Sequence, residues 1–106
     1  MLDIQYLISL NKELGGSLLS LSAIESCFSS VDYYKDKKSK IASVFRSIIK
    51  NHAFTDGNKR TAVLVLYLLC ESTGVKLNKN TDELIHLTIS VAENKFSVSE
   101  IKDMLF

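Results

Sequence analysis

The sequence contains no proline and only four glycines among its 106 residues. These two residues are the strongest local markers of turns, and apolar residues recur three and four positions apart through most of the chain. Both features indicate a helical domain. No internal repeat or low-complexity linker is evident, and a hydrophobic content of 46% is enough for one core. We therefore expect a single domain over residues 1–106.

A strong charge of one sign is also missing, because thirteen basic residues face twelve acidic ones and the formal net charge is +1. A chain with so small a net charge has no overall electrostatic field that would attract nucleic acid or a membrane surface, so we expect neither as a direct partner. The longest apolar run, residues 62–70, is far shorter than the roughly 18 residues that would indicate a membrane span. It is typical of a buried core helix.

Only two cysteines occur, Cys27 and Cys70, and both lie in apolar settings without a Cys or His at metal-binding spacing. We interpret them as reduced core thiols, which favours a reducing compartment. The first residues, Met-Leu-Asp-Ile-Gln, have no basic region and no small-residue cleavage site, so they do not resemble a signal peptide. These features predict a cytoplasmic protein.

Apolar periodicity predicts an all-α fold of five to six short helices around one central apolar helix. The helices are expected at residues 3–14, 22–30, 41–51, 58–72, 82–94 and 98–105. Gly15 and Gly16 end the first helix and Gly74 ends the fourth. The helix over residues 58–72 carries the apolar run and is expected at the centre of the core.

Three capping-box patterns predict helix starts, because in each a polar side chain and a glutamate satisfy amides that the helix leaves unpaired. The patterns pair Ser22 with Glu25, Asn80 with Glu83 and Ser97 with Glu100. The lysine-rich residues 35–40 are interrupted by an aspartate, and we interpret them as a solvated helix start rather than a surface for acidic RNA. Residues 17–21 are expected to be extended.

The stretch from His52 to Arg60 places a titratable base, a carboxylate, a glycine and two cations directly before a predicted helix. Free amides at a helix start, with the positive end of the helix dipole, attract an anion, and Gly57 lets the backbone come close to a phosphate. Asn58 and Lys59, together with Arg60, can add side-chain donors. This pattern predicts an anion-binding loop.

Two further side chains of this stretch indicate its chemistry. Asp56 is suited to hold a divalent cation, because Mg²⁺ usually takes one or two protein carboxylates plus substrate oxygens. Histidine exchanges protons near neutral pH, so His52 is the natural general base. Phe54 is expected to anchor the loop in the core. Simpler interpretations stay open: Asp56 could be an N-cap, and Lys59 with Arg60 could be ordinary solvated residues.

The order His-x-Phe-x-Asp-Gly-Asn-Lys-Arg-Thr-Ala over residues 52–62 resembles the signature of the Fic/Doc superfamily. It is most similar to the Doc (death-on-curing) toxin branch. The resemblance covers residues 40–106 well and the first forty residues loosely, mainly through the two glycines. It implies a Fic/Doc-like helical domain, with a short β-flap near residues 17–21 that aligns the target segment as an added strand.

The resemblance implies that His52 activates a protein hydroxyl and that Asp56 binds Mg²⁺. It assigns the phosphates of ATP to Gly57, Asn58 and Arg60, to which we add Lys59. The protein would then be a bacterial toxin that transfers phosphate from Mg-ATP to a serine or threonine of a translation elongation factor. No inhibitory Ser/Thr-x-x-x-Glu-Gly/Asn helix is found in the sequence, so a separate antitoxin chain is the expected partner.

Two positions bear on which group is transferred. The AMP-transferring branch of the superfamily usually has a glycine where this chain has Lys59 and a second arginine where it has Val63. These differences favour phosphate transfer, and AMP transfer to a protein hydroxyl is kept as an alternative. A third hypothesis is a non-catalytic helical protein-binding module, in which the loop only caps a helix.

Overall fold

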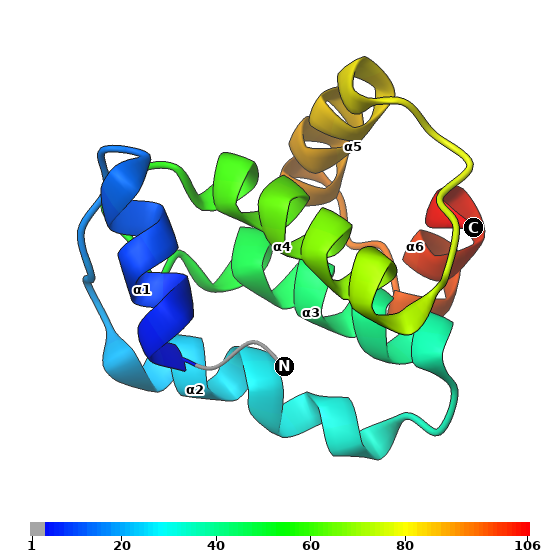
Figure 1. Cartoon of the computed structure of the whole chain (residues 1–106), viewed down its shortest axis with the longest axis horizontal. Coiled ribbons are helices and arrows are strands. Elements are labelled where there is room, and N and C mark those ends of the chain that lie inside the picture. The colour runs from blue at the N-terminus through cyan, green and yellow to red at the C-terminus, as the bar shows by residue number, and fades with distance from the viewer. Residues whose placement is uncertain (1–3) are drawn as a thin grey trace.

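Helix α4, Asn58–Thr73, runs through the middle of the molecule alongside α3, Lys37–Asn51 (Figure 1). The computed structural model describes residues 4–106 of the chain. The other α-helices are α1 (Ile4–Glu13), α2 (Leu21–Ser29), α5 (Thr81–Glu93) and α6 (Val98–Leu105), and a short 3-10 helix, η1 (Ser30–Tyr33), follows α2. The predicted all-α fold around a central apolar helix is confirmed.

The core lies between α3 and α4 and is closed by the remaining helices. Helix α3 contributes Phe45, Ile48 and Ile49, and α4 contributes Val65 and Leu66, all at most 2% exposed. Burying a side chain of this size stabilises the fold by about 1.5–3 kcal/mol. Among residues 4–106, no helix is both long enough and apolar enough to cross a membrane.

Both cysteines are free thiols in this core, as predicted. Burial raises the pKa of the Cys27 thiol to about 11, while a hydrogen bond from Asn51 opposes part of the rise. Burial also raises the pKa of Cys70. A thiol that stays protonated at neutral pH is a poor nucleophile and a poor metal ligand. We therefore assign both cysteines a packing role.

Helix α1 ends at the predicted pair of glycines. The N–H of Gly15 donates to the carbonyl of Lys12 at 3.0 Å, and the N–H of Gly16 donates to the carbonyl of Asn11 at 3.1 Å. Gly15 has a φ of +89°, in the left-handed region that glycine enters without steric cost. The predicted start of this helix at Asp3 lies outside the described residues.

Two of the three predicted capping boxes are present, at Asn80 and Ser97, and they begin α5 and α6. The prediction at Ser22 was wrong. Helix α2 begins at Leu21 because the Oγ of Ser20 accepts an amide hydrogen bond from its first turn at 3.2 Å. Ser22 lies inside that turn, with its own Oγ 3.1 Å from the Ser20 Oγ.

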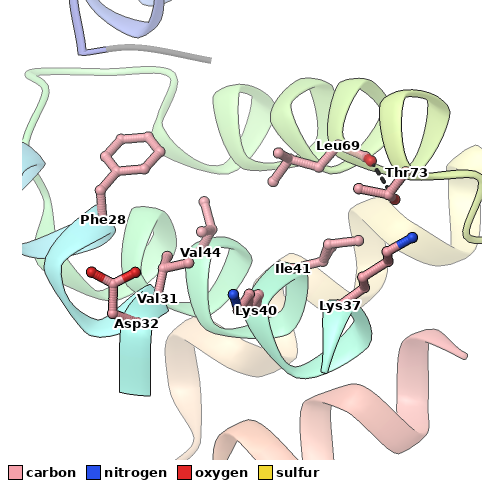
Figure 2. A pocket seen from close by; sticks show the side chains of 9 residues that line it. All are labelled: Phe28, Val31, Asp32, Lys37, Lys40, Ile41, Val44, Leu69 and Thr73. Carbon is pink, nitrogen blue, oxygen red and sulfur yellow. Dashed lines mark hydrogen bonds between the residues drawn. The ribbon is translucent and has the colours of Figure 1, made fainter. Parts of the chain in front are cut away.

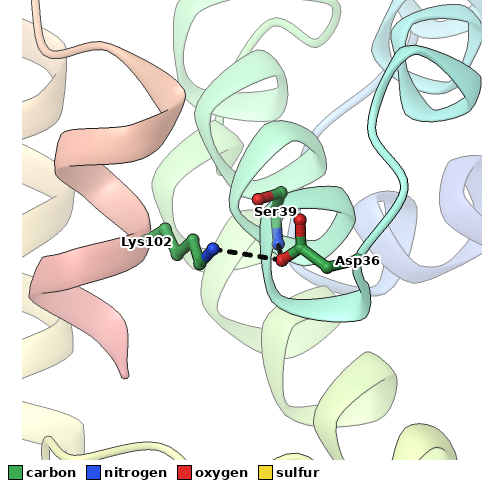
Figure 3. Close-up of polar contacts among 3 residues, drawn as sticks. All are labelled: Asp36, Ser39 and Lys102. Atoms are coloured by element: carbon green, nitrogen blue, oxygen red, sulfur yellow. Dashed lines mark hydrogen bonds and ion pairs between the residues drawn. The ribbon is translucent and has the colours of Figure 1, made fainter.

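Helix α3 begins at Lys37 rather than near Ile41 because Asp36 caps it. The Oδ2 of Asp36 accepts from the Ser39 amide at 2.9 Å and lies 3.2 Å from the ammonium of Lys102 on α6 (Figure 3). Hydrogen bonds from Ser39, with a smaller contribution from Lys102, lower the pKa of Asp36 to about 2. The lysine-rich stretch is therefore a helix start, as interpreted, and its cap also connects α3 to α6.

The segment between α1 and α2 runs antiparallel to the first part of the loop between α3 and α4. Leu18 and Phe54 form an isolated β-bridge, and the Leu19 amide donates to the Ala53 carbonyl at 2.7 Å. The extended backbone expected over residues 17–21 is thus present in part. It pairs with this loop rather than forming a hairpin of its own, and the described residues contain no sheet.

Candidate active site

An open pocket of about 370 Å³ lies where α3 ends and α4 begins. Its walls are Ile49, His52 and every residue from 55 to 60. The motif residues expected to act together therefore surround one cavity. Phe54 is the exception, because it is 2% exposed and belongs to the core. This agrees with the expectation that Phe54 anchors the loop in the core.

His52 is the residue at which the chain leaves α3. Its φ of +48° lies in the left-handed region, and within residues 4–106 it is the one non-glycine residue there. This conformation costs a residue with a Cβ roughly 1–2 kcal/mol. Strain of this kind is concentrated at functional sites, where the surrounding structure maintains it. The side chain of His52 is exposed and lines the pocket, so an incoming hydroxyl can reach it.

Asn58 closes the loop that carries these residues. Its Nδ2 donates to the Phe54 carbonyl at 2.9 Å, and its Oδ1 accepts from the Phe54 amide at 3.3 Å. The sequence predicted that this side chain donates to phosphate, and the structure adds loop closure. An amide nitrogen carries two hydrogens, so one hydrogen of Nδ2 is left for a ligand.

Asp56 is exposed at the rim of the pocket, and its Oδ1 accepts from the Gly57 amide at 2.7 Å. The interpretation of Asp56 as a simple N-cap was wrong, because the N-cap of α4 is Gly57, with a φ of +73°. The described residues contain no group of three or more His, Cys, Asp or Glu side chains placed to hold a metal. A single carboxylate fits Mg²⁺ that takes its other ligands from substrate and water.

The first turn of α4 presents amides to the pocket. Its first intrahelical hydrogen bond runs from the Thr61 amide to the Gly57 carbonyl at 2.8 Å. The preceding amides, those of Asn58, Lys59 and Arg60, have no carbonyl acceptor within the helix, because the helix begins at Asn58. Cations are unfavourable at the positive end of a helix dipole unless an anion is present, and both cationic side chains here are exposed and line the pocket. These features support an anion site.

Sequence reasoning missed Asn11 on α1, which is hydrogen-bonded to the motif loop. This side chain on α1 is 0% exposed. Its Nδ2 donates to the main-chain carbonyl of Asp56 at 2.9 Å and to the Oγ1 of Thr61 at 3.1 Å. A signal was available, because Asn11 follows Leu7 and Ile8 at helical spacing on the apolar face of α1. A polar side chain at such a position requires a buried hydrogen-bond partner.

An apolar groove of about 500 Å³ adjoins the pocket on the side of α5. It shares Lys59 and Arg60 with the pocket, so the two cations stand between the two hollows. The rest of its wall is mainly apolar and includes Val63, Leu64 and Ile89. The groove therefore offers an apolar surface with positive charge at one end.

A third hollow, of about 210 Å³, lies between η1, α3 and α4 (Figure 2). Its lining is mostly apolar, with Phe28, Val44 and Leu69 among its residues, and it contains no residue of the motif. Charge is confined to one aspartate and two lysines. This cavity is therefore separate from the anion site.

Comparison with known protein families agrees with the geometry of the site. The model of the Fic/DOC family matches residues 2–70, a span that contains the pocket-lining loop and most of α4. The chain belongs to the Fic/DOC family. Members of this family are generally nucleotide-transferring enzymes, so membership indicates a protein-modifying enzyme or toxin of the Fic/Doc type. No curated protein matches the sequence.

Proposed function

We propose that the protein is a Doc-like toxin that transfers the γ-phosphate of Mg-ATP to a serine or threonine hydroxyl of a translation elongation factor. One observation carries the proposal: the pocket at the start of α4 gathers His52, Asp56, Lys59 and Arg60 around about 370 Å³. A proton acceptor, a carboxylate and two cations are the groups that phosphoryl transfer requires. The volume is within the range of small-molecule sites.

The phosphates of ATP would bind to the unpaired amides of the first turn of α4. Arg60 can hold two phosphate oxygens at once through its guanidinium, and Lys59 adds a point charge. Asp56 would bind Mg²⁺, which neutralises phosphate oxygens when bound. The Gly57 amide donates to the Asp56 Oδ1 at 2.7 Å, so it helps to fix the carboxylate that would hold Mg²⁺.

His52 would take the proton of the target hydroxyl as its oxygen attacks the γ-phosphorus. The bond from the γ-phosphorus to the bridging oxygen breaks, and ADP leaves with that electron pair. Proton removal by a positioned histidine contributes about 10²- to 10⁴-fold. Placement of the two reactants and neutralisation of charge supply most of the remaining acceleration.

The target segment would bind along the extended backbone between α1 and α2. Because the Leu19 amide donates to Ala53, the N–H and C=O of Leu18 point to the opposite side of the segment. Leu18 and Leu19 are 38% and 63% exposed, so they can contact apolar side chains of the target. Addition of the target as a strand would bring its hydroxyl to a loop that is hydrogen-bonded to the same segment.

Two residues favour phosphate transfer over AMP transfer. Lys59 stands where the AMP-transferring branch usually has glycine, and Val63 stands where that branch has a second arginine. The side chain of Val63 is 7% exposed and lines the apolar groove. Helix α4 thus places an apolar surface where a second guanidinium would otherwise lie.

We further propose a separate antitoxin chain as partner, with the groove between α4 and α5 as its docking place. The groove has apolar walls, and it shares Lys59 and Arg60 with the anion pocket. An amphipathic segment with a carboxylate at one end would match both features. Bound there, it would compete with ATP for the two cations.

The proposal is tested by incubating the purified protein with Mg²⁺, a bacterial lysate and ATP labelled at either the γ or the α position. His52→Ala serves as the control. Label that reaches one protein from the γ position only, and is lost in the control, supports the proposal. Label from the α position only would make the protein an AMP transferase. No label from either position would favour the non-catalytic binding module.

A further inference from the structure

We infer that Asn11 is a positioning residue that sets the direction of the peptide group between Asp56 and Gly57 at the anion pocket. The inference rests on the proposed nucleotide-binding function of that pocket. Asn11 belongs to α1, is 0% exposed, and lies 45 residues before Asp56 in the sequence. Its side chain therefore connects the N-terminal helix to the motif loop.

The two ends of this peptide group point in opposite directions, because a trans peptide directs its C=O and N–H to opposite sides. The described residues contain no cis peptide bond. The Nδ2 of Asn11 holds the Asp56 carbonyl at 2.9 Å, toward α1. The Gly57 N–H consequently points away from α1 and donates to the Asp56 carboxylate at 2.7 Å. Both residues line the pocket.

Without Asn11 the peptide group could turn over. Gly57 has a φ of +73°, and glycine populates both signs of φ about equally, so its own sterics do not select one orientation. The reversed peptide would aim a carbonyl oxygen at the pocket and repel phosphate. The second hydrogen bond of Asn11, to the Thr61 Oγ1 at 3.1 Å, fixes the same side chain to the first turn of α4. Loop and helix are thereby held in one arrangement.

Packing alone does not account for an asparagine at this position. The Oδ1 of Asn11 is buried and has no hydrogen-bond partner among the described residues. A buried unpaired oxygen is destabilising, and a leucine of similar size would avoid it. Gly16 leaves space for the same contact, because a Cβ there would overlap both the Asn11 Oδ1 and the Asp56 carbonyl oxygen. The donors of Asn11 are therefore the reason for its placement.

The test compares Asn11→Leu and Asn11→Ala with the wild-type protein. The affinity for Mg-ATP is measured by calorimetry, and the melting temperature is measured in parallel. We expect roughly tenfold weaker binding in both variants, about the contribution of one hydrogen bond to a charged group. Asn11→Leu should lower the melting temperature less than Asn11→Ala, because leucine fills the buried space and removes the unpaired Oδ1, although the Asp56 carbonyl and the Thr61 Oγ1 lose their donor in both variants.

Leu7→Val is the matched control, since Leu7 is buried one turn earlier on the same face of α1. It should lower the melting temperature without weakening Mg-ATP binding. Equal affinities in the wild type and Asn11→Leu would overturn the inference, as would an equal weakening in Leu7→Val.

A second readout needs no nucleotide. In the unliganded protein, the amide resonance of Gly57 should move or broaden in Asn11→Leu and stay unchanged in Leu7→Val. An unchanged resonance in Asn11→Leu overturns the inference. Absence of Mg-ATP binding in the wild type would instead count against the proposed function, so the two failures are distinguishable.

Discussion

The side chain of Asn58 closes the motif loop onto Phe54, with a hydrogen bond of 2.9 Å to its carbonyl and one of 3.3 Å from its amide. Phe54 is 2% exposed, so the loop is tied to the core at this point. The pocket thus has a defined shape before any ligand binds. Preorganised donors need no rearrangement when charge arrives, which is the main electrostatic advantage of an enzyme site.

Asn58→Ala should lower the free energy of unfolding by about 1–2 kcal/mol, because both hydrogen bonds to Phe54 are lost. It should also weaken binding of Mg-ATP, since the loop is no longer closed. Urea unfolding and calorimetry measure the two effects. Asn78→Ala is the control, because Asn78 is exposed and lies in the connection between α4 and α5, after the end of α4 opposite to the loop. Equal free energies of unfolding and equal Mg-ATP affinities in the two variants would contradict loop closure by Asn58.

His52→Gly should raise the free energy of unfolding by about 0.5–1 kcal/mol while abolishing group transfer. Glycine relieves the strain at a φ of +48°, and its greater freedom in the unfolded chain cancels part of the gain. His52→Ala should abolish transfer without the gain in stability, because alanine keeps its Cβ. A glycine variant less stable than the wild type would show that the imidazole stabilises the fold instead.

Leu19→Asp should lower kcat/KM for the protein target roughly tenfold, on the order of one lost apolar contact. Leu19 is 63% exposed, so neither the melting temperature nor Mg-ATP affinity should change. Tyr33→Asp is a suitable comparison, because Tyr33 is 88% exposed and lies on η1. Equal kcat/KM values in the two variants would argue against target binding along this segment.

Acid should destabilise the protein partly through Asp36. Its pKa is about 2 in the folded protein, against about 3.9 in an unfolded chain. Because the folded value is the lower one, the stabilisation is complete above the unfolded pKa and is lost as pH falls through the folded pKa. Asp36→Asn keeps an acceptor for the Ser39 amide but cannot titrate. Denaturant unfolding between about pH 4 and pH 2 should therefore show a shallower loss of stability in this variant, and parallel curves would contradict the assignment.

Signals contained within one helical turn are the ones that the sequence predicts well. The caps at Asn80 and Ser97 and the stop at Gly74 depend only on neighbouring residues, and all are present. The start of α2 shows the limit of this approach. Ser20 and Ser22 are both able to cap, and the observed start uses the earlier one. The order of residues 52–60 likewise predicts one pocket, because these residues follow each other around a single turn of the chain.

Contacts between distant segments were not predictable from this sequence. The bridge between Leu18 and Phe54 joins two segments that carry no pairing signal of their own. The hydrogen bond from Asn11 to Asp56 spans 45 residues. In the sequence Asn11 appears only as a polar residue on an apolar face. Its partner, the Asp56 carbonyl, is identified only by the position of α1 relative to the loop in the folded structure. The left-handed backbone of His52 is equally a product of tertiary structure.

The most direct test of the central claim is to titrate isotope-labelled protein with Mg-ATP and follow its amide resonances. We predict that the largest shifts occur at His52 and at residues 57–60, which line the pocket at the start of α4. Arg60→Ala should reduce these shifts at the same nucleotide concentration. Shifts centred instead on the apolar cavity around Val44 and Leu69, or no shifts at all, would contradict the assignment of the nucleotide site.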